Sequence, residues 1–425
     1  MVCANDEDNF HPAPVWLTAE YLEKILQENK KDNTIRVTDL EIKPATAKGE
    51  NYASIMTRVK VDFIEQQSKD TQHEYYIVKT TYENDPVISK IMSAYHVDKT
   101  EMIMYEKILP ELSKLLQEIG DDSKLFADTI HVDYEHSAII FEDLAVSDFI
   151  LADRLEGMDM LECKLALKKL AKMHATAAVL NVRHGGILEK FDHGIFNRHT
   201  KGFAPFFENL IGVSAEFAGE CTGLGEYYKE KLLKLKEHVV EYATRVYDPQ
   251  PGHFLTLTHG DFWVNNMMVS YDKCGQNGSK EIKDLILIDF QFCTWSSPAV
   301  DLHYFFNTSM RDELRFNHQD EFIQYYYNIL VQTLHELKFT GKIPSLHELC
   351  VQLEAGRFYA VTSTLVVQPI MINDNTENAD MNALLMTDER GKNFRKLLYS
   401  NKKIQNNVKK LLPVFDQKGL LDVTD

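Results

Sequence analysis

The sequence of 425 residues has few cysteines and no long apolar run. Its six cysteines lie far apart and include no C-x-x-C pair, so no disulfide framework is indicated. The most apolar stretch, residues 359–372, is interrupted by polar side chains and is too short to span a bilayer. We therefore expect reduced thiols and no membrane span.

Positive charge is also scarce, with 46 basic against 64 acidic residues and a formal net charge of -18. This balance argues against nucleic acid or an anionic membrane as the main partner. The first eight residues carry neither the basic residues nor the apolar run of a signal peptide. A cytoplasmic protein is expected, and no pattern indicates an obligate protein partner.

The remaining composition, 44% hydrophobic and 26% charged, is that of a globular chain long enough for two lobes. Strand-like alternation over residues 36–64 and 74–81, and a hairpin pattern over 131–141, predict an antiparallel sheet. A helix capped by Thr18 should precede it. We place the lobe boundary after Asp143, which gives an N-lobe of residues 1–143 and a C-lobe of residues 144–425.

Helical periodicity dominates elsewhere. A helix from Ile88 to Ile108 should end at Pro110, and residues 111–119 should continue helically. Further helices are predicted over 160–180, within 203–247 and over 320–337. The expected fold class is α+β, with a small sheet-rich N-lobe followed by a large helical C-lobe.

Polar residues interrupt the helical part between Leu255 and Asp289. Strand patterns cover 255–258, 267–271 and 284–288, and the dipeptide Asn277-Gly278 favours a tight hairpin between the last two. A two-residue turn there would place Asn266 opposite Asp289. A bulge or a longer loop would shift this pairing.

The side chains around this hairpin suit phosphoryl transfer. Asp261 is a candidate base for an attacking hydroxyl, while Asn266 and Asp289 offer hard oxygen ligands to Mg²⁺. His-Gly-Asp alone is weak evidence and also fits a polar turn entering a strand. A metallophosphatase is an alternative use of His259, Asp261 and Asn266, but it would need paired Asp/His motifs that we do not find upstream.

The segment His259-Gly-Asp-Phe-Trp-Val-Asn-Asn266 followed by Leu287-Ile-Asp-Phe-Gln291 resembles the signature of aminoglycoside and choline kinases. Trp263 to Asn266 most resemble the insect ecdysteroid kinase-like family, also described as the CHK kinase-like domain. This resemblance implies a bilobal protein kinase-like fold and an enzyme that uses ATP and Mg²⁺ as cofactors.

The same resemblance assigns residues in the N-lobe. Lys79, by itself an ordinary strand lysine, would hold the nucleotide phosphates and be aligned by a glutamate on the next helix. Glu101 is the first candidate for that glutamate and Glu106 is the rival.

Residues 49–54 lie where kinases cover the phosphates, but with one glycine the loop would rely on backbone amides and the Ser54 hydroxyl. A plain β-turn is the alternative. Glu142 and Leu144 resemble the hinge that binds adenine through its backbone.

Two further residues are expected to support the site without reacting. Asp301 resembles a family position that braces the catalytic loop, and His174 is expected to be a packed histidine.

The acceptor implied by the resemblance is a small molecule with a hydroxyl, such as an ecdysteroid, another sterol, or a lipophilic alcohol or phenol. Choline, ethanolamine or an aminoglycoside is the alternative, and these cations would need carboxylates or an aromatic cage. A catalytically silent kinase-like binding protein is a third possibility. Retention of Lys79, Asp261, Asn266 and Asp289 argues against it.

Overall fold

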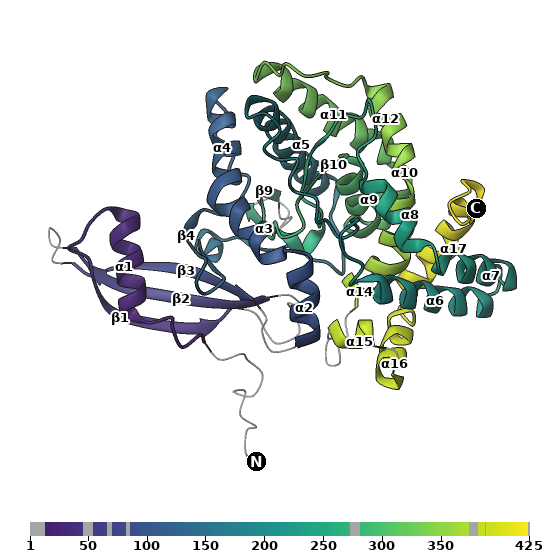
Figure 1. Cartoon of the computed structure of the whole chain (residues 1–425), viewed down its shortest axis with the longest axis horizontal. Helices are drawn as coiled ribbons and strands as arrows, with labels where there is room; N and C mark the ends of the chain where they lie inside the picture. Colours follow the sequence, from purple (N-terminus) through teal and green to yellow (C-terminus); the bar gives the residue numbers. More distant parts are fainter. Residues whose placement is uncertain are drawn as a thin grey trace, which may run out of the picture.

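The computed structural model describes residues 13–45, 54–65, 70–81, 86–272, 281–373, 381–386 and 388–423. The N-terminal part forms a five-stranded antiparallel sheet in the order β1-β2-β3-β5-β4. Its strands are β1 (Arg36–Pro44), β2 (Ser54–Ile64), β3 (Gln72–Thr81), β4 (Thr129–Asp133) and β5 (Ala138–Glu142). Figure 1 shows this sheet on the left and the mainly helical part of the chain to its right.

Helix α1 (Ala19–Lys30) covers one face of the sheet, as Figure 1 shows. The Thr18 hydroxyl accepts a hydrogen bond from the Tyr21 amide, which confirms the predicted N-cap. Leu22 and Leu26 are buried together with the inward residues of β2, such as Val59. The alternation that predicts these strands therefore reflects a sheet with one face packed on a helix.

The connection from β3 to β4 is helical but is not one continuous helix. It consists of α2 (Pro86–Ala94), α3 (Val97–Ile103), the π-helical turn η2 (Met104–Ile108) and α4 (Leu109–Glu118). His96 separates α2 from α3 with a left-handed φ of 54°.

The predicted stop at Pro110 is wrong, because the proline lies in the first turn of α4, where no amide hydrogen is needed. In the widened turn before it, the Leu109 amide donates to the Met104 carbonyl, five residues back.

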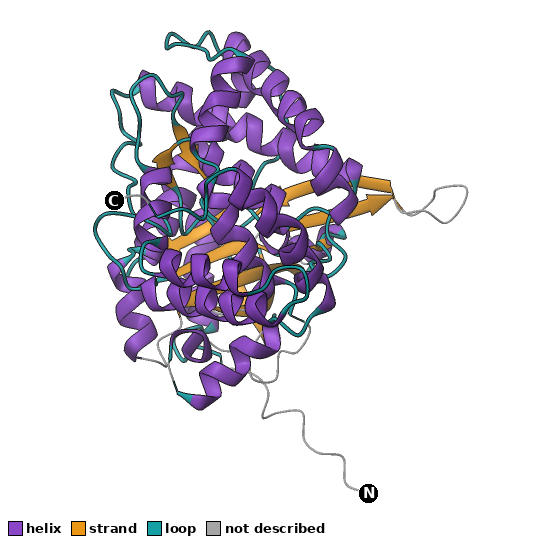
Figure 2. Cartoon of the chain, turned by 90° about the vertical axis from the view of Figure 1, so that its right-hand side faces the viewer, coloured by secondary structure: helices purple, strands orange, loops and turns teal. Residues whose placement is uncertain are grey.

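Helices form most of the chain after the sheet (Figure 2). They are α5 (Met160–Arg183), α6 (Ala204–Glu220), α7 (Glu226–Lys236), α8 (Val239–Tyr247), α9 (Ala299–Thr308), α10 (Asp312–Asn317), α11 (Gln319–Glu336), α12 (Leu346–Ala355), α13 (Phe358–Thr362), α14 (Gln368–Met371), α15 (Met381–Leu385), α16 (Glu389–Leu398) and α17 (Lys402–Gln417). Short turns add η3 (Leu144–Ser147), η4 (Val264–Asn266) and η5 (Ser363–Val367). The α+β fold class is as predicted.

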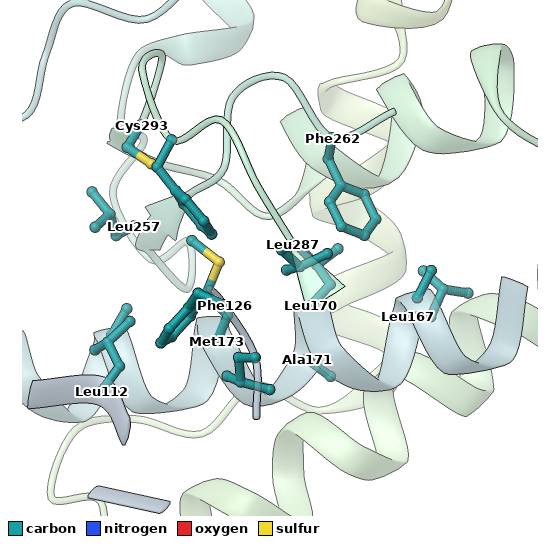
Figure 3. Packing of buried hydrophobic residues seen from close by; sticks show 14 of the residues in the cluster. Leu112, Phe126, Leu167, Leu170, Ala171, Met173, Leu257, Phe262, Leu287 and Cys293 are labelled. Atoms are coloured by element: carbon teal, nitrogen blue, oxygen red, sulfur yellow. The ribbon is translucent and has the colours of Figure 1, made fainter. Parts of the chain in front are cut away.

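Helix α5 is the central support of the helical part. An Asp159–Glu162 capping box starts it, and most of its length is buried. Figure 3 shows Leu170 and Met173 of α5 in one apolar cluster with Leu257 and Leu287, which flank the polar loop identified in the sequence. Burying each such leucine contributes roughly 1.5–3 kcal/mol, so α5 fixes the strands on which that loop is mounted.

Strands β8 (Met267–Asp272) and β9 (Glu281–Leu287) form the predicted hairpin, with β6 (Ile150–Leu151) on the other edge of β8. Strand β7 (Thr256–Thr258) pairs instead with β10 (Thr294–Ser296).

The predicted pairing of Asn266 with Asp289 is wrong by one residue. Met267 pairs with Leu287, and the Ile288 amide donates to the Asn266 carbonyl at 3.0 Å. The register also shifts between Ser270 and Tyr271, which a symmetric two-residue turn does not allow. Asn277-Gly278 lies outside the described residues.

The cysteines within the described part, Cys163, Cys221, Cys293 and Cys350, are free thiols. No helix that the structure describes combines the length and apolar character needed to cross a membrane.

Candidate active site

Lys79 joins the sheet to the helical part of the chain. Its Nζ lies 2.8 Å from Oε1 of Glu101 on α3 and 2.9 Å from Oδ1 of Asp289, just after β9. The rival Glu106 accepts a hydrogen bond from the Tyr134 hydroxyl at 2.7 Å. The structure therefore pairs Lys79 with Glu101, as predicted, and adds Asp289 as a second partner.

The two carboxylates keep Lys79 charged. Burial disfavours the ammonium form, but the attraction of Asp289 and Glu101 outweighs it and raises the pKa of Lys79 above its ordinary value. A charged ammonium group held between two elements is suited to binding phosphate oxygens.

Asp289 has a left-handed backbone with φ of 67°. This conformation costs an L-residue with a Cβ about 1–2 kcal/mol, so the surrounding packing must impose it. The buried Phe290 ring supplies part of that packing, since it contacts the rings of Tyr105, Phe126 and His259. The turn directs the Asp289 carboxylate to Lys79.

Asp261 is held by two hydrogen bonds. The Tyr304 hydroxyl donates to Oδ1 at 2.7 Å, and the Asn266 amide donates to Oδ2 at 3.0 Å. Burial, with repulsion from Asp289, raises the pKa of the Asp261 carboxyl to about 7, against the effect of both hydrogen bonds. The carboxylate is thus oriented and more basic than an ordinary aspartate, both of which suit a general base.

Asn266 presents its amide nitrogen to Asp261, contacting the backbone carbonyl at 2.9 Å as well as the carboxylate. Its Oδ1 lies on the other side of the amide group and is the atom suited to a cation. With the Asp289 carboxylate, it makes a set of hard oxygen donors of the kind that Mg²⁺ prefers. The residues present therefore fit the magnesium ion expected from the sequence.

Asp301, on α9, braces the loop that carries Asp261. Its carboxylate accepts the backbone amides of His259 at 2.7 Å and Gly260 at 2.8 Å, and it lies 2.9 Å from Nε2 of His174. The other His174 nitrogen contacts the Tyr326 hydroxyl at 2.7 Å. Both predictions, a bracing Asp301 and a packed His174, are confirmed by these contacts.

Gly260 is required by the same loop. Its φ is 80°, and a Cβ there would lie 2.1 Å from the Phe292 carbonyl oxygen. The backbone after Asp289 and the backbone before Asp261 therefore pass too close for any other residue.

Ser54, at the start of β2, lies beside Lys79 and Glu101 in a small pocket that is partly open to solvent. Gln291 and Asp98 line the same pocket. Ser54 therefore lies near Lys79, and its contact with a phosphate stays a prediction. Residues 49–53 of that loop lie outside the described residues.

The predicted hinge follows β5. The Glu142 side chain is engaged away from the site, by the Asp128 amide at 2.6 Å and Lys124 at 2.5 Å. Asp143 pairs with Arg58 at 2.6 Å, and Leu144 is buried in the main core. Any contribution of Glu142 to adenine binding is therefore left to its backbone.

Tyr304 is the site residue that the sequence reasoning misses. It follows Asp301 by three residues on α9, so both side chains project from one face of that helix toward the loop that carries Asp261. This spacing is the signal that would have found it. Behind Tyr304 lies Tyr359, with ring centroids 5.7 Å apart, and the Tyr359 hydroxyl bonds to that of Tyr247 at 2.7 Å.

The family model of the ecdysteroid kinase-like family matches residues 48–339. The chain belongs to the ecdysteroid kinase-like family. This ecdysteroid kinase-like protein is accordingly a small-molecule kinase, and its family implies ATP and a divalent metal ion. The matched range contains the site residues from Ser54 to Tyr304.

Comparison of the ecdysteroid kinase-like chain with curated proteins finds no match. Among solved structures it is similar to choline kinase from Cryptosporidium parvum Iowa II, with 13% identity, a TM-score of 0.46, and coverage of 95% of this chain and 98% of the other. It is also similar to a glucosamine kinase, with 10% identity, a TM-score of 0.23, and coverage of 96% and 98%.

Proposed function

We propose that this protein transfers the γ-phosphoryl group of ATP to a hydroxyl of an ecdysteroid, another sterol, or a related lipophilic alcohol or phenol, with Mg²⁺ as the metal. The observation that carries the proposal is the convergence at Lys79. Residues as far apart as Glu101 and Asp289 meet its ammonium group, within reach of a loop that presents Asp261 and Asn266.

The nucleotide would lie between the N-lobe, residues 1–143, and the C-lobe, residues 144–425. Lys79 binds phosphate oxygens, and Glu101 keeps its side chain extended toward them. Ser54 borders the same pocket and adds a hydroxyl donor. Glu142 and Leu144 would border the adenine with backbone groups.

Asn266 and Asp289 would hold the metal through their side-chain oxygens. When bound, Mg²⁺ offsets the negative charge of the phosphates. Lys79 is attached to Asp289 by an ion pair of 2.9 Å, so the same carboxylate links the phosphate-binding ammonium to the metal site.

Asp261 orients the acceptor hydroxyl and accepts its proton as the new P–O bond forms and the bond from the γ-phosphorus to ADP breaks, so that ADP leaves. Tyr304 and Asn266 fix the rotation of this carboxylate before the acceptor arrives. Orientation of this kind removes part of the entropic cost of bringing the reacting groups together.

An acceptor with rings and few charges suits the aromatic surroundings of Asp261. Tyr304 contacts it directly, the half-buried Trp263 follows it by two residues, and Tyr359 stacks behind Tyr304. Such side chains gain most from burying apolar area against a flat acceptor.

The test is a screen for phosphorylated products, by mass spectrometry, with ecdysteroids, other sterols, phenolic glycosides and choline as acceptors. Asp289→Asn serves as the inactive control. We expect Mg-ATP-dependent transfer to a sterol or phenol, and no product with Asp289→Asn.

Two results would overturn the proposal. Transfer to choline alone would assign the enzyme to the cationic acceptors, and binding of Mg-ATP without transfer to any acceptor would identify a silent binding protein.

A further inference from the structure

A group of metal-ligand side chains lies outside the active site, in the loop after α5. Asp192, His193 and His199 each present one ligand atom, and these three atoms lie within 4.8 Å of one another. Asp192 Oδ1 is 2.5 Å from His193 Nδ1, and Asp192 Oδ2 is 2.8 Å from His199 Nε2. One carboxylate thus lies against two imidazoles, although no kinase step uses them.

The donor set indicates the class of ion. Imidazole nitrogens with one carboxylate suit Zn²⁺ and its transition-metal neighbours, whereas Mg²⁺ and Ca²⁺ prefer oxygen donors throughout. Tetrahedral zinc, with bonds of about 2.0–2.1 Å, needs ligand atoms roughly 3.3 Å apart. Because the His193 and His199 rings are stacked with their planes 8° apart, the exposed His199 ring has to turn toward Asp192 and His193 for both imidazoles to bind one ion.

The loop backbone is fixed from within, so the ligands are held close together before an ion binds. Buried Asn197 accepts the amides of His199 at 2.8 Å and Thr200 at 2.9 Å, and its own amide donates to the Gly194 carbonyl at 2.8 Å. Phe196 is buried against the rings of Tyr247 and Phe207. The backbone of this loop therefore loses little conformational entropy when an ion binds.

A third histidine connects this loop to the catalytic machinery. The His193 ring stacks on His199 at 4.4 Å on one side and on His96 at 4.2 Å on the other. His96 is the left-handed residue that begins α3, the helix that carries Glu101. An ion that fixes the position of His193 thereby also fixes the stacking contact between His193 and His96 at the start of α3.

We propose that Asp192, His193 and His199 form a binding site for one zinc-class divalent cation, which fastens the 192–199 loop to the start of α3. The ring nitrogens that now face Asp192 would give their lone pairs to the ion, and each imidazole proton would move to the other ring nitrogen. Water completes the coordination, since Asp192 and His199 are both about half exposed, with side-chain exposures of 48% and 49%.

The test uses the full chain without a polyhistidine tag, titrated with Zn²⁺ by calorimetry in buffer containing excess Mg²⁺ to occupy oxygen-rich sites. We expect one zinc ion per chain. His199→Gln or Asp192→Asn should weaken binding at least by about 10- to 100-fold. A zinc-dependent rise in Tm should appear in the wild-type chain and disappear in both variants.

The matched control is His318→Gln. His318 pairs with Glu321 at 3.1 Å, a carboxylate that Lys164 also contacts at 2.7 Å, and the side-chain exposures of 42% and 46% resemble those of the proposed site. This variant should bind zinc as the wild type does. Wild-type protein that binds no zinc, or binding unchanged in His199→Gln and Asp192→Asn, would overturn the proposal.

Co²⁺ substitution provides a second readout, because it reports on the ligands directly. A visible spectrum of tetrahedral or five-coordinate nitrogen and oxygen ligation supports the site. A thiolate charge-transfer band would instead place the ion on a cysteine such as the exposed Cys350, and would also overturn the proposal.

Discussion

Tyr304 is the residue whose hydroxyl touches the proposed base directly, and its replacement by Phe isolates that contact. We expect Tyr304→Phe to lower kcat by about 10-fold, equivalent to about 1.4 kcal/mol, because Asp261 loses the donor that orients it. The KM for ATP should not change. Steady-state kinetics with the acceptor found in the screen measures both.

Tyr247→Phe is the matched control for this experiment. It removes a buried tyrosine hydroxyl from the same aromatic group, where it bonds to Tyr359 and not to Asp261. We expect a similar loss of stability in the two variants but a fall in kcat only for Tyr304→Phe. Equal kinetic effects would show that Tyr304 acts through packing alone.

Substitutions at Asp261 and at Lys79 should impair different steps of the reaction. Asp261→Ala should lower kcat by a factor on the order of 10² to 10⁴ while ATP still binds, since the carboxylate acts on the acceptor. Lys79→Met should weaken ATP binding itself, because the ammonium group is lost. Calorimetric titration with Mg-ATP separates the two, and full turnover by Asp261→Ala would contradict its role as base.

For individual residues, the sequence predicts which residues belong to the site better than it predicts which side chains contact one another. Asp261, Asn266 and Asp289 are recognisable because their spacing around two strands fits one chemistry. Tyr304 is not, because an aromatic residue on a helix is usually core, and only the fold shows that its hydroxyl reaches a carboxylate 43 positions away.

Among the connections between secondary-structure elements, the loop between β7 and η4 is tightly constrained at Gly260. Gly260→Ala combines a left-handed φ with a Cβ placed 2.1 Å from the Phe292 carbonyl oxygen, so the segment before β10 or the loop itself must move. We expect a loss of at least about 3 kcal/mol in the free energy of unfolding, measured by urea denaturation, together with loss of activity.

Gly252→Ala provides the comparison. Its φ of 84° is equally left-handed, but a Cβ there meets nothing within 4 Å. Gly252→Ala should lower the free energy of unfolding by about 1–2 kcal/mol, which is the cost of the left-handed backbone alone. The difference in unfolding free energy between Gly260→Ala and Gly252→Ala therefore measures the energetic effect of the close backbone contact at Gly260. Equal losses in the two variants would mean that the two backbones do not lie so close together in solution.

Periodicity predicts most elements but not their interruptions. The α1 cap, the sheet strands and α5 follow from local patterns. The break at His96, the π-helical turn before Pro110 and the shifted β8–β9 register do not, since each is decided by packing between distant segments. Two of these three interruptions lie in the helical segment that positions Glu101.

In the whole molecule, the attachment of α1 to the sheet should depend on acid pH through Asp133. Its carboxylate accepts hydrogen bonds from the Tyr21 hydroxyl and from the backbone amides of Glu135 and His136, and it bonds to Nδ1 of the His136 ring at 2.8 Å. Burial opposes the charged form, but these bonds prevail and lower the pKa of Asp133 to about 2. Because the folded pKa is below the unfolded value, the stabilisation is complete above about pH 4 and is lost toward pH 2.

We expect roughly 2 kcal/mol of unfolding free energy to disappear across this window, as measured by urea denaturation at several pH values. Asp133→Asn should remove this part of the pH dependence. Glu135→Gln, at the exposed neighbouring position, keeps its backbone amide and should leave the dependence in place. An unchanged pH profile in Asp133→Asn would contradict the assignment.

The α+β architecture follows from the order of strand and helix patterns. What the sequence leaves open is the acceptor, because the aromatic residues around Asp261 come from segments as distant as Trp263 and Tyr359, and core packing alone accounts for their composition.

The ion pair between Lys79 and Asp289 has a consequence for synthesis on the ribosome. Its two residues are separated by 210 positions. At a synthesis rate of about 5–20 residues per second, roughly 10–40 s pass between the synthesis of Lys79 in β3 and that of Asp289. Throughout that interval Lys79 lacks one of its two carboxylate partners. A nascent chain halted before Asp289 therefore has all strands of the N-terminal sheet but holds Lys79 with Glu101 alone.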